Sequence, residues 1–268
     1  MLRLPAVAGQ FYPANPQELV NLVRQFTQNT PANKTRVKAC LVPHAGYVYS
    51  GHVSGAVLAR IELPRKILIL GVRHLPRGES AAILSEGAWR TPLGNAQIAH
   101  QLAQELKQEC SLLREDALAH AQEHSLEVQL PFLQVLAPDF QFAPVALGTI
   151  RFEELQTIGE AIARVLRNSQ EEILLLTTSD LNHFEDEMAT RKKDAKAIAQ
   201  LEALNPRGLY DVCRTDSISM CGLGPAVAML IALRTLGATR GETVEYATSA
   251  AVSGDHRRVV GYAGMIFD

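Results

Sequence analysis

The sequence alternates short, wholly apolar runs with longer stretches of helical periodicity, and this alternation limits the fold more than any other feature. The run 66–71, KILILG, is typical of a buried strand, whereas 152–168 repeats apolar residues along one helix face. Strands that are apolar on both faces and are separated by helices occur in parallel sheets covered on both sides. The sequence therefore predicts an α/β fold with a mostly parallel central sheet.

The same patterns place the other elements. Strands are expected at 37–42, 66–71, 140–147, 172–179, 243–250 and 258–267. Helices are expected at 52–61, 94–109, 123–136, 152–168, 185–204 and 224–237. Because no repeat, low-complexity tract or linker divides the 268 residues, we expect a single domain over residues 1–268.

Composition excludes several classes of partner. A net charge of −2 gives no electrostatic reason to expect nucleic acid or an anionic membrane. No run approaches the ~18 apolar residues of a membrane span, and Pro5, Gly9 and Pro13 interrupt the apolar core that a signal peptide needs. We therefore expect a cytoplasmic protein whose four widely spaced cysteines are free thiols.

Three predicted strands end at a histidine. His44 follows 37–42, His74 follows 66–71, and Asp180 and His183 follow 172–179. The carboxyl ends of parallel strands lie along one edge of a sheet, where α/β proteins bind ligands. A single such histidine is usually a loop or core residue, but three at corresponding positions predict a shared site. Imidazole is a ligand for iron, copper, zinc and nickel, so the arrangement indicates a metal site.

Cys221 is the cysteine with the strongest functional indication. It stands in MCGLGP, where two glycines and Pro225 precede an apolar helix. The positive end of a helix dipole favours the thiolate, which is the form that binds metal or reacts. Free cysteines are more often small buried hydrophobic residues, and we interpret the other three in that way: Cys40, Cys110 and Cys213.

His124 has two interpretations. It lies just before a predicted helix, so the segment could be an N-terminal cap with Ser125 as the capping residue. Alternatively, His124 contacts the substrate or supports a ligand. No role is assigned to the remaining histidines, which are His52, His100, His120 and His256.

Six ordered motifs of this chain resemble the Memo family, also called AmmeMemoRadiSam system protein B. They are AGQFYPANP, PHAGYVYSG, EHSLEVQLPFLQ, TTSDLNHF, MCGLGP and VVGYAGMIF, and they span nearly the whole chain. The family is similar in fold to the class III (LigB-type) extradiol dioxygenases, which use non-haem iron(II). Its second name suggests partner proteins of a radical-enzyme system.

The resemblance implies roles for individual residues. His44, His74 and Cys221 match the metal-binding positions, His183 matches an acid/base histidine, and Asp180 stands beside it. Iron(II) is the expected ion. A cysteine in place of the dioxygenase carboxylate also suits copper or zinc, so ring cleavage does not follow from the fold.

Two further residues are candidate substrate contacts. The family usually has GPNH or GPSH where this chain has GVRH, so Arg73 adds a cation that holds an anionic substrate or points to solvent. Tyr47, in the YVYSG stretch beside His44, is expected to contact a peptide or small ligand.

Three functions fit these residues. The leading hypothesis is a metal-dependent redox enzyme in which His183, oriented by Asp180, removes a proton from the bound substrate. The rival is a non-catalytic scaffold that keeps the pocket for a peptide or small-molecule ligand. A hydrolase with Cys221 as nucleophile and His183 as base ranks last, because it leaves two histidines without a role.

Overall fold

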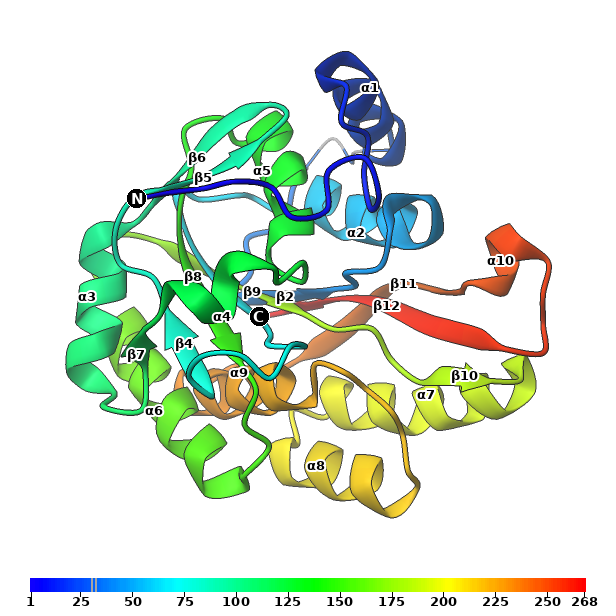
Figure 1. Ribbon diagram of the computed structural model, residues 1–268. Helices are drawn as coiled ribbons and strands as arrows, with labels where there is room; N and C mark the ends of the chain where they lie inside the picture. The colour runs from blue at the N-terminus through cyan, green and yellow to red at the C-terminus, as the bar shows by residue number, and fades with distance from the viewer. Residues whose placement is uncertain (30, 32) are drawn as a thin grey trace.

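A twelve-stranded sheet forms the centre of the computed structural model, which describes residues 1–29, 31 and 33–268 (Figure 1). The strands along the sheet are, in order, β1 (Leu2–Arg3), β5 (Ala88–Thr91), β6 (Gly94–Ile98), β8 (Gln141–Leu147), β3 (Lys66–Val72), β9 (Ile173–Thr178), β2 (Ala39–Val42), β12 (Val259–Phe267) and β10 (His183–Glu185). Three strands branch from this path: β11 (Gly241–Thr248) on β12, β4 (Ala81–Ile83) on β8, and β7 (Arg114–Glu115) on β4.

The four central strands β8, β3, β9 and β2 are parallel to one another. Antiparallel pairs lie outside them, at β5–β6 and β4–β8 on one side and at β12 with β2, β10 and β11 on the other. The predicted α/β class with a mostly parallel sheet is confirmed. All four central strands therefore deliver their carboxyl ends to one edge.

Helices cover both faces of the sheet, as Figure 1 shows. One face carries α1 (Pro16–Phe26), α2 (Tyr47–Arg60) and α5 (Leu130–Leu136), which follows the 3₁₀ turn η1 (Glu127–Gln129). The other carries α3 (His100–Glu109), α6 (Phe152–Asn168), α7 (Glu187–Glu202), α8 (Pro206–Thr215) and α9 (Leu223–Thr235). Two short helices, α4 (Ala117–Ala121) and α10 (Ala250–Ser253), lie in connections.

Strand β3 shows why a continuous apolar run predicts this architecture. Ile67 and Ile69 pack in the core on the α2 side, whereas Leu68 and Leu70 pack in the core on the α9 side. Alternate side chains of a strand point to opposite faces, so a strand between two helix layers is apolar throughout. Full burial of each such side chain contributes about 1.5–3 kcal/mol.

Two predicted helices begin later than the sequence indicated. The stretch 94–109 starts as β6, because it forms an antiparallel hairpin with β5, and α3 begins only at His100. Gly94, with φ of 117°, permits that hairpin turn. The stretch 123–136 is helical only from Glu127, because residues 123–126 pack against the end of β3. By contrast, α6 has the predicted bounds, and α1 and α8 were not predicted.

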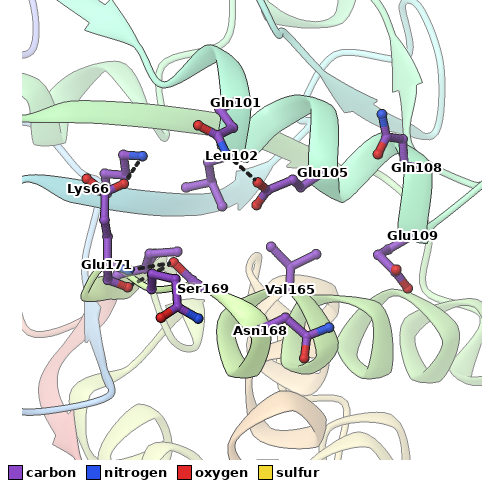
Figure 2. Close-up of a pocket in the computed structure, with 12 residues that line it drawn as sticks. Lys66, Gln101, Leu102, Glu105, Gln108, Glu109, Val165, Asn168, Ser169 and Glu171 are labelled. Carbon is purple, nitrogen blue, oxygen red and sulfur yellow. Dashed lines mark hydrogen bonds and ion pairs between the residues drawn. The ribbon is translucent and has the colours of Figure 1, made fainter.

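A cavity of about 260 Å³ lies between α3 and α6 at the opposite, amino edge of the sheet (Figure 2). Lys66 and Ile173, the first residues of β3 and β9, lie at its wall. Two pairs of its polar side chains bind each other, Lys66 with Glu171 and Gln101 with Glu105. None of the predicted site residues lines it. Within the described part of the chain, no helix is long and apolar enough to cross a membrane.

Candidate metal centre

The carboxyl ends of β2, β9 and β3, three adjacent strands, carry the predicted site. His44, Asp180 and His74 each follow their strand by two residues. Cys221 reaches the same place from the loop before α9, whose first residue is Leu223. The ligating atoms of His44, His74 and Cys221 all lie within 4.8 Å of one another. Three segments that are distant in sequence therefore form one potential metal site.

His44 is buried and its ring is fixed on both sides. Nδ1 lies 2.5 Å from Thr178 Oγ1 on β9, and Nε2 lies 3.1 Å from Cys221 Sγ. The backbone N–H of His44 donates to Asp180 Oδ1 at 2.9 Å. Burial, together with the neighbouring imidazoles, holds the pKa of His44 well below its usual value. The ring is thus neutral, with Nε2 directed at the site.

Cys221 approaches β9 closely because Gly222 has no side chain: a Cβ there would lie 2.4 Å from the Cβ of Ser179. The backbone N–H of Asp180 donates to the sulfur at 3.3 Å. Burial raises the pKa of the Cys221 thiol, and the Asp180 carboxyl raises it further. Without a bound cation the thiol form is therefore favoured, contrary to the expectation that the helix start favours thiolate. A bound cation would ionise the thiol.

Glu123, which was not predicted as a site residue, binds His74 through both carboxylate oxygens. Oε2 accepts the backbone N–H of His74 at 2.6 Å, and Oε1 lies 2.9 Å from its Nδ1. Burial alone would raise the pKa of Glu123, but the hydrogen bonds from the His74 ring, the Ser125 N–H and the His74 N–H lower it to about 2. Glu123 is therefore ionised although only 1% of its surface is exposed.

His124 lies among the site imidazoles. Its ring stacks on His74 with centroids 4.6 Å apart, lies 5.5 Å from the His44 ring, and packs on Phe11 at 4.7 Å. Burial lowers the pKa of His124 to about 4. The capping interpretation of this segment is wrong, because Ser125 Oγ is hydrogen-bonded to the N–H and C=O of Val72 instead of a helix N-terminus.

The orientation of His183 differs from the prediction. Its Nδ1 is 2.9 Å from the carbonyl oxygen of Ser219, and its backbone N–H donates to Ser219 Oγ at 2.8 Å. Asp180 accepts the His44 N–H, so it does not orient His183 through a hydrogen bond. Ser219 has that role. The side chains of Asp180, His183 and Cys221 nevertheless converge, with potential ligand atoms within 4.8 Å of one another.

Tyr47 and Arg73, the two other predicted substrate contacts, both make hydrogen bonds within the protein. Tyr47 is buried, donates its hydroxyl to the carbonyl of Val128 at 2.6 Å and packs on Phe132, so it is a core residue. The first turn of α2 directs it inward. The Arg73 guanidinium donates to the carbonyls of Arg77 and Gly78 in exposed hydrogen bonds, and its Nε lies close to Gly148.

The donor set fits a mononuclear transition-metal ion. His44 and His74 both engage Nδ1 in hydrogen bonds, which leaves Nε2 of each ring for a ligand bond. Two imidazoles and one cysteine sulfur suit iron(II), copper and zinc, and are unsuited to magnesium or calcium, which prefer oxygen ligands. The hydrogen bond to Glu123 is the outer-shell contact typical of metal-binding histidines.

Comparisons with known proteins show first a shared fold and then a family. In structure, the chain resembles an uncharacterized Escherichia coli K12 protein, with a TM-score of 0.57 at 13% identity over 86% of this chain and 100% of that one, which shows a shared fold. In sequence, residues 3–266 match the family model described as Memo-like protein. MEMO1 family proteins of Methanopyrus kandleri and Aquifex aeolicus are each 39% identical, over 100% and 99% of this chain and 99% of each relative. The chain belongs to the Memo family.

Proposed function

We propose that this Memo-family protein is a metal-dependent redox enzyme that binds iron(II), or alternatively copper, through His44, His74 and Cys221. The observation that carries the proposal is the convergence of their ligating atoms within 4.8 Å at the carboxyl edge of the sheet. A purely structural role would not need ligating atoms of two histidines and one cysteine within 4.8 Å of one another. When bound, the ion would supply Lewis acidity and an exchangeable electron.

His183 is the residue proposed to move a proton. If its Nδ1–H donates to the Ser219 carbonyl, its Nε2 carries the lone pair and can accept a proton from a substrate hydroxyl or thiol. Ser219 contacts the ring at Nδ1 and the backbone of His183 at its N–H, so this orientation does not depend on substrate. His124, stacked on His74, is proposed to contact the substrate from the other side.

Metal content tests the proposal directly. Protein purified without oxygen and loaded with iron(II) should bind about one ion per chain. His44→Ala, His74→Ala and Cys221→Ser should each lose most of it. His52→Ala, on α2 outside the site, is the matched control and should bind as the wild type does. Undiminished binding in the three site variants would exclude this metal site.

Turnover separates an enzyme from a scaffold. Oxygen consumption by the iron- or copper-loaded protein should be measured against catechols and thiols, with His183→Gln as the comparison. The proposal predicts turnover with at least one class and its loss in His183→Gln. The absence of turnover together with intact binding of a peptide or small ligand would favour the scaffold function.

A further inference from the structure

We propose that Glu123 is the positioning residue that fixes the tautomer of His74 and thereby directs its Nε2 at the metal site. This inference deepens the proposed function, because it rests on His74 as a ligand. Glu123 itself is not expected to touch the ion or the substrate: both its oxygens are already engaged.

Three N–H groups converge on the two oxygens of Glu123. Oε2 accepts the backbone N–H of His74 at 2.6 Å. Oε1 accepts the backbone N–H of Ser125 at 2.8 Å and lies 2.9 Å from His74 Nδ1. A carboxylate has only acceptor sites, so Nδ1 must carry a proton, and in the neutral ring Nε2 then has the lone pair. The ring of His74 is therefore prepared to bind a cation before any cation arrives.

The turn that carries Glu123 is held in place independently. Ser125 Oγ accepts the N–H of Val72 at 3.1 Å and donates to its carbonyl at 2.9 Å. Ser125 and Leu126 also press on Gly71, where a Cβ would lie 2.7 Å from Ser125 Oγ. The Glu123 carboxylate is thus rigidly placed at the end of β3, and it contacts both the backbone N–H and the ring Nδ1 of His74.

A glutamine at position 123 cannot reproduce this arrangement, although its shape is nearly the same. Its one amide oxygen can face either the His74 backbone N–H or the pair formed by Nδ1–H and the Ser125 N–H. The amide NH₂ then faces a donor in either case. Where it faces Nδ1, the ring must take the other tautomer, with the proton on Nε2, and that nitrogen can no longer bind metal.

The first test needs no substitution. Metal-free wild-type protein labelled with ¹⁵N-histidine is examined at about pH 8, where unpaired imidazoles are neutral. Long-range ¹H–¹⁵N correlation spectra then distinguish the two tautomers, and the His74 signal is identified from its loss in His74→Gln. We expect the proton on Nδ1. A proton on Nε2, or rapid averaging of the two forms, overturns the proposal.

The second test compares Glu123→Gln with Glu115→Gln, in the same samples and by Co²⁺ titration. Glu115 accepts hydrogen bonds from Ser85 and Lys107 far from the site, so its variant controls for the loss of a bound carboxylate. We expect Glu123→Gln to shift the His74 tautomer and to weaken Co²⁺ binding by about 10- to 100-fold. Glu115→Gln should change neither.

The two readouts separate this inference from the proposed function. If wild-type protein binds no Co²⁺ but His74 has its proton on Nδ1 and loses it in Glu123→Gln, the metal hypothesis fails and the positioning role stands. If Co²⁺ binds and His74 keeps its proton on Nδ1 both in Glu123→Gln and in Glu123→Leu, which offers no acceptor to Nδ1 in any orientation, the positioning role is wrong. Thermal unfolding of each variant identifies loss of the fold, and the wild-type tautomer remains decisive in that case.

Discussion

The stretch 123–129 contains two buried glutamates that serve different parts of the molecule. Glu123, in its first part, accepts hydrogen bonds from His74 and faces the potential metal ligands. Glu127, four residues later, binds Arg3 at 2.7 Å and accepts the Tyr12 hydroxyl and two backbone N–H groups of the N-terminal segment. The same residue type thus orients the site at one position and anchors the fold at the other.

The difference follows from the donors that each carboxylate meets. Glu123 meets an imidazole ring and backbone N–H groups, so its charge acts on a side chain that can change tautomer. Glu127 meets a guanidinium that is itself buried, with Arg3 only 7% exposed. A buried ion pair is costly to break because the remaining charge has no solvent. Site function and stability should therefore separate in variants of these two positions.

The largest expected effect is on stability, at Glu127. Glu127→Ala leaves Arg3 buried without its counter-charge and removes the acceptor of the Tyr12 hydroxyl, so the free energy of unfolding should fall by about 3–5 kcal/mol. Urea denaturation measures this loss. The Co²⁺ affinity of folded Glu127→Ala should stay within about threefold of the wild-type affinity, unlike that of Glu123→Gln. A loss below about 1 kcal/mol would remove the distinction between the two glutamates.

A third buried carboxylate, Asp194, sharpens the comparison through pH. It accepts the Asn182 N–H and the Tyr246 hydroxyl beside Arg191, but burial dominates and raises its pKa from 3.8 to about 6. A raised carboxyl pKa favours the protonated folded state. This contribution is therefore complete below pH 3.8 and is lost as pH rises through about 6, for a total of about 3 kcal/mol.

Asp194→Asn should abolish that dependence. The difference in unfolding free energy between wild type and Asp194→Asn, measured by urea denaturation, should shift by about 2.4 kcal/mol in favour of the variant from pH 4 to pH 7. Asp139→Asn, at an exposed position, provides the control. A difference that is independent of pH would show that Asp194 is ionised throughout, as Glu123 is.

A smaller effect is expected at Ser125. Ser125→Ala removes the hydroxyl that pairs both polar groups of Val72, which leaves a buried N–H and C=O without this partner. The expected cost is about 1–3 kcal/mol in unfolding free energy. Because the two hydrogen bonds between Ser125 Oγ and Val72 also hold the turn that carries Glu123, the Co²⁺ affinity of Ser125→Ala should fall as well, though less than that of Glu123→Gln. Wild-type affinity in Ser125→Ala would show that Glu123 is held by its own hydrogen bonds alone.

The fold could be predicted from the sequence where burial alone decides the pattern. The run 66–71 is apolar because β3 lies between two helix layers, and 152–168 has a helical period because one face of α6 is buried. The pattern failed at 94–98, where pairing with β5 overrides a spacing that also fits a helix. Such pairing depends on residues outside the local window.

The site was predictable only in part, for a similar reason. Strand order explains how His44 and His74 come to one edge, and the sequence shows both strand ends. The roles of Glu123 and Ser219 depend on how two loops pack against those ends, which no local spacing reveals. Tyr47 was misplaced because it and Tyr49 occupy the same turn of α2, and only the helix orientation shows that Tyr47 faces the core.

The most direct test of the central claim is an anomalous difference map at the iron edge. The crystal should be grown without oxygen or chelators, in the presence of iron(II). We predict one strong peak within about 2.0–2.4 Å of His44 Nε2, His74 Nε2 and Cys221 Sγ, at ordinary ligand-bond distances. A map without a peak among these atoms, or with the iron held elsewhere in the chain, would contradict the account.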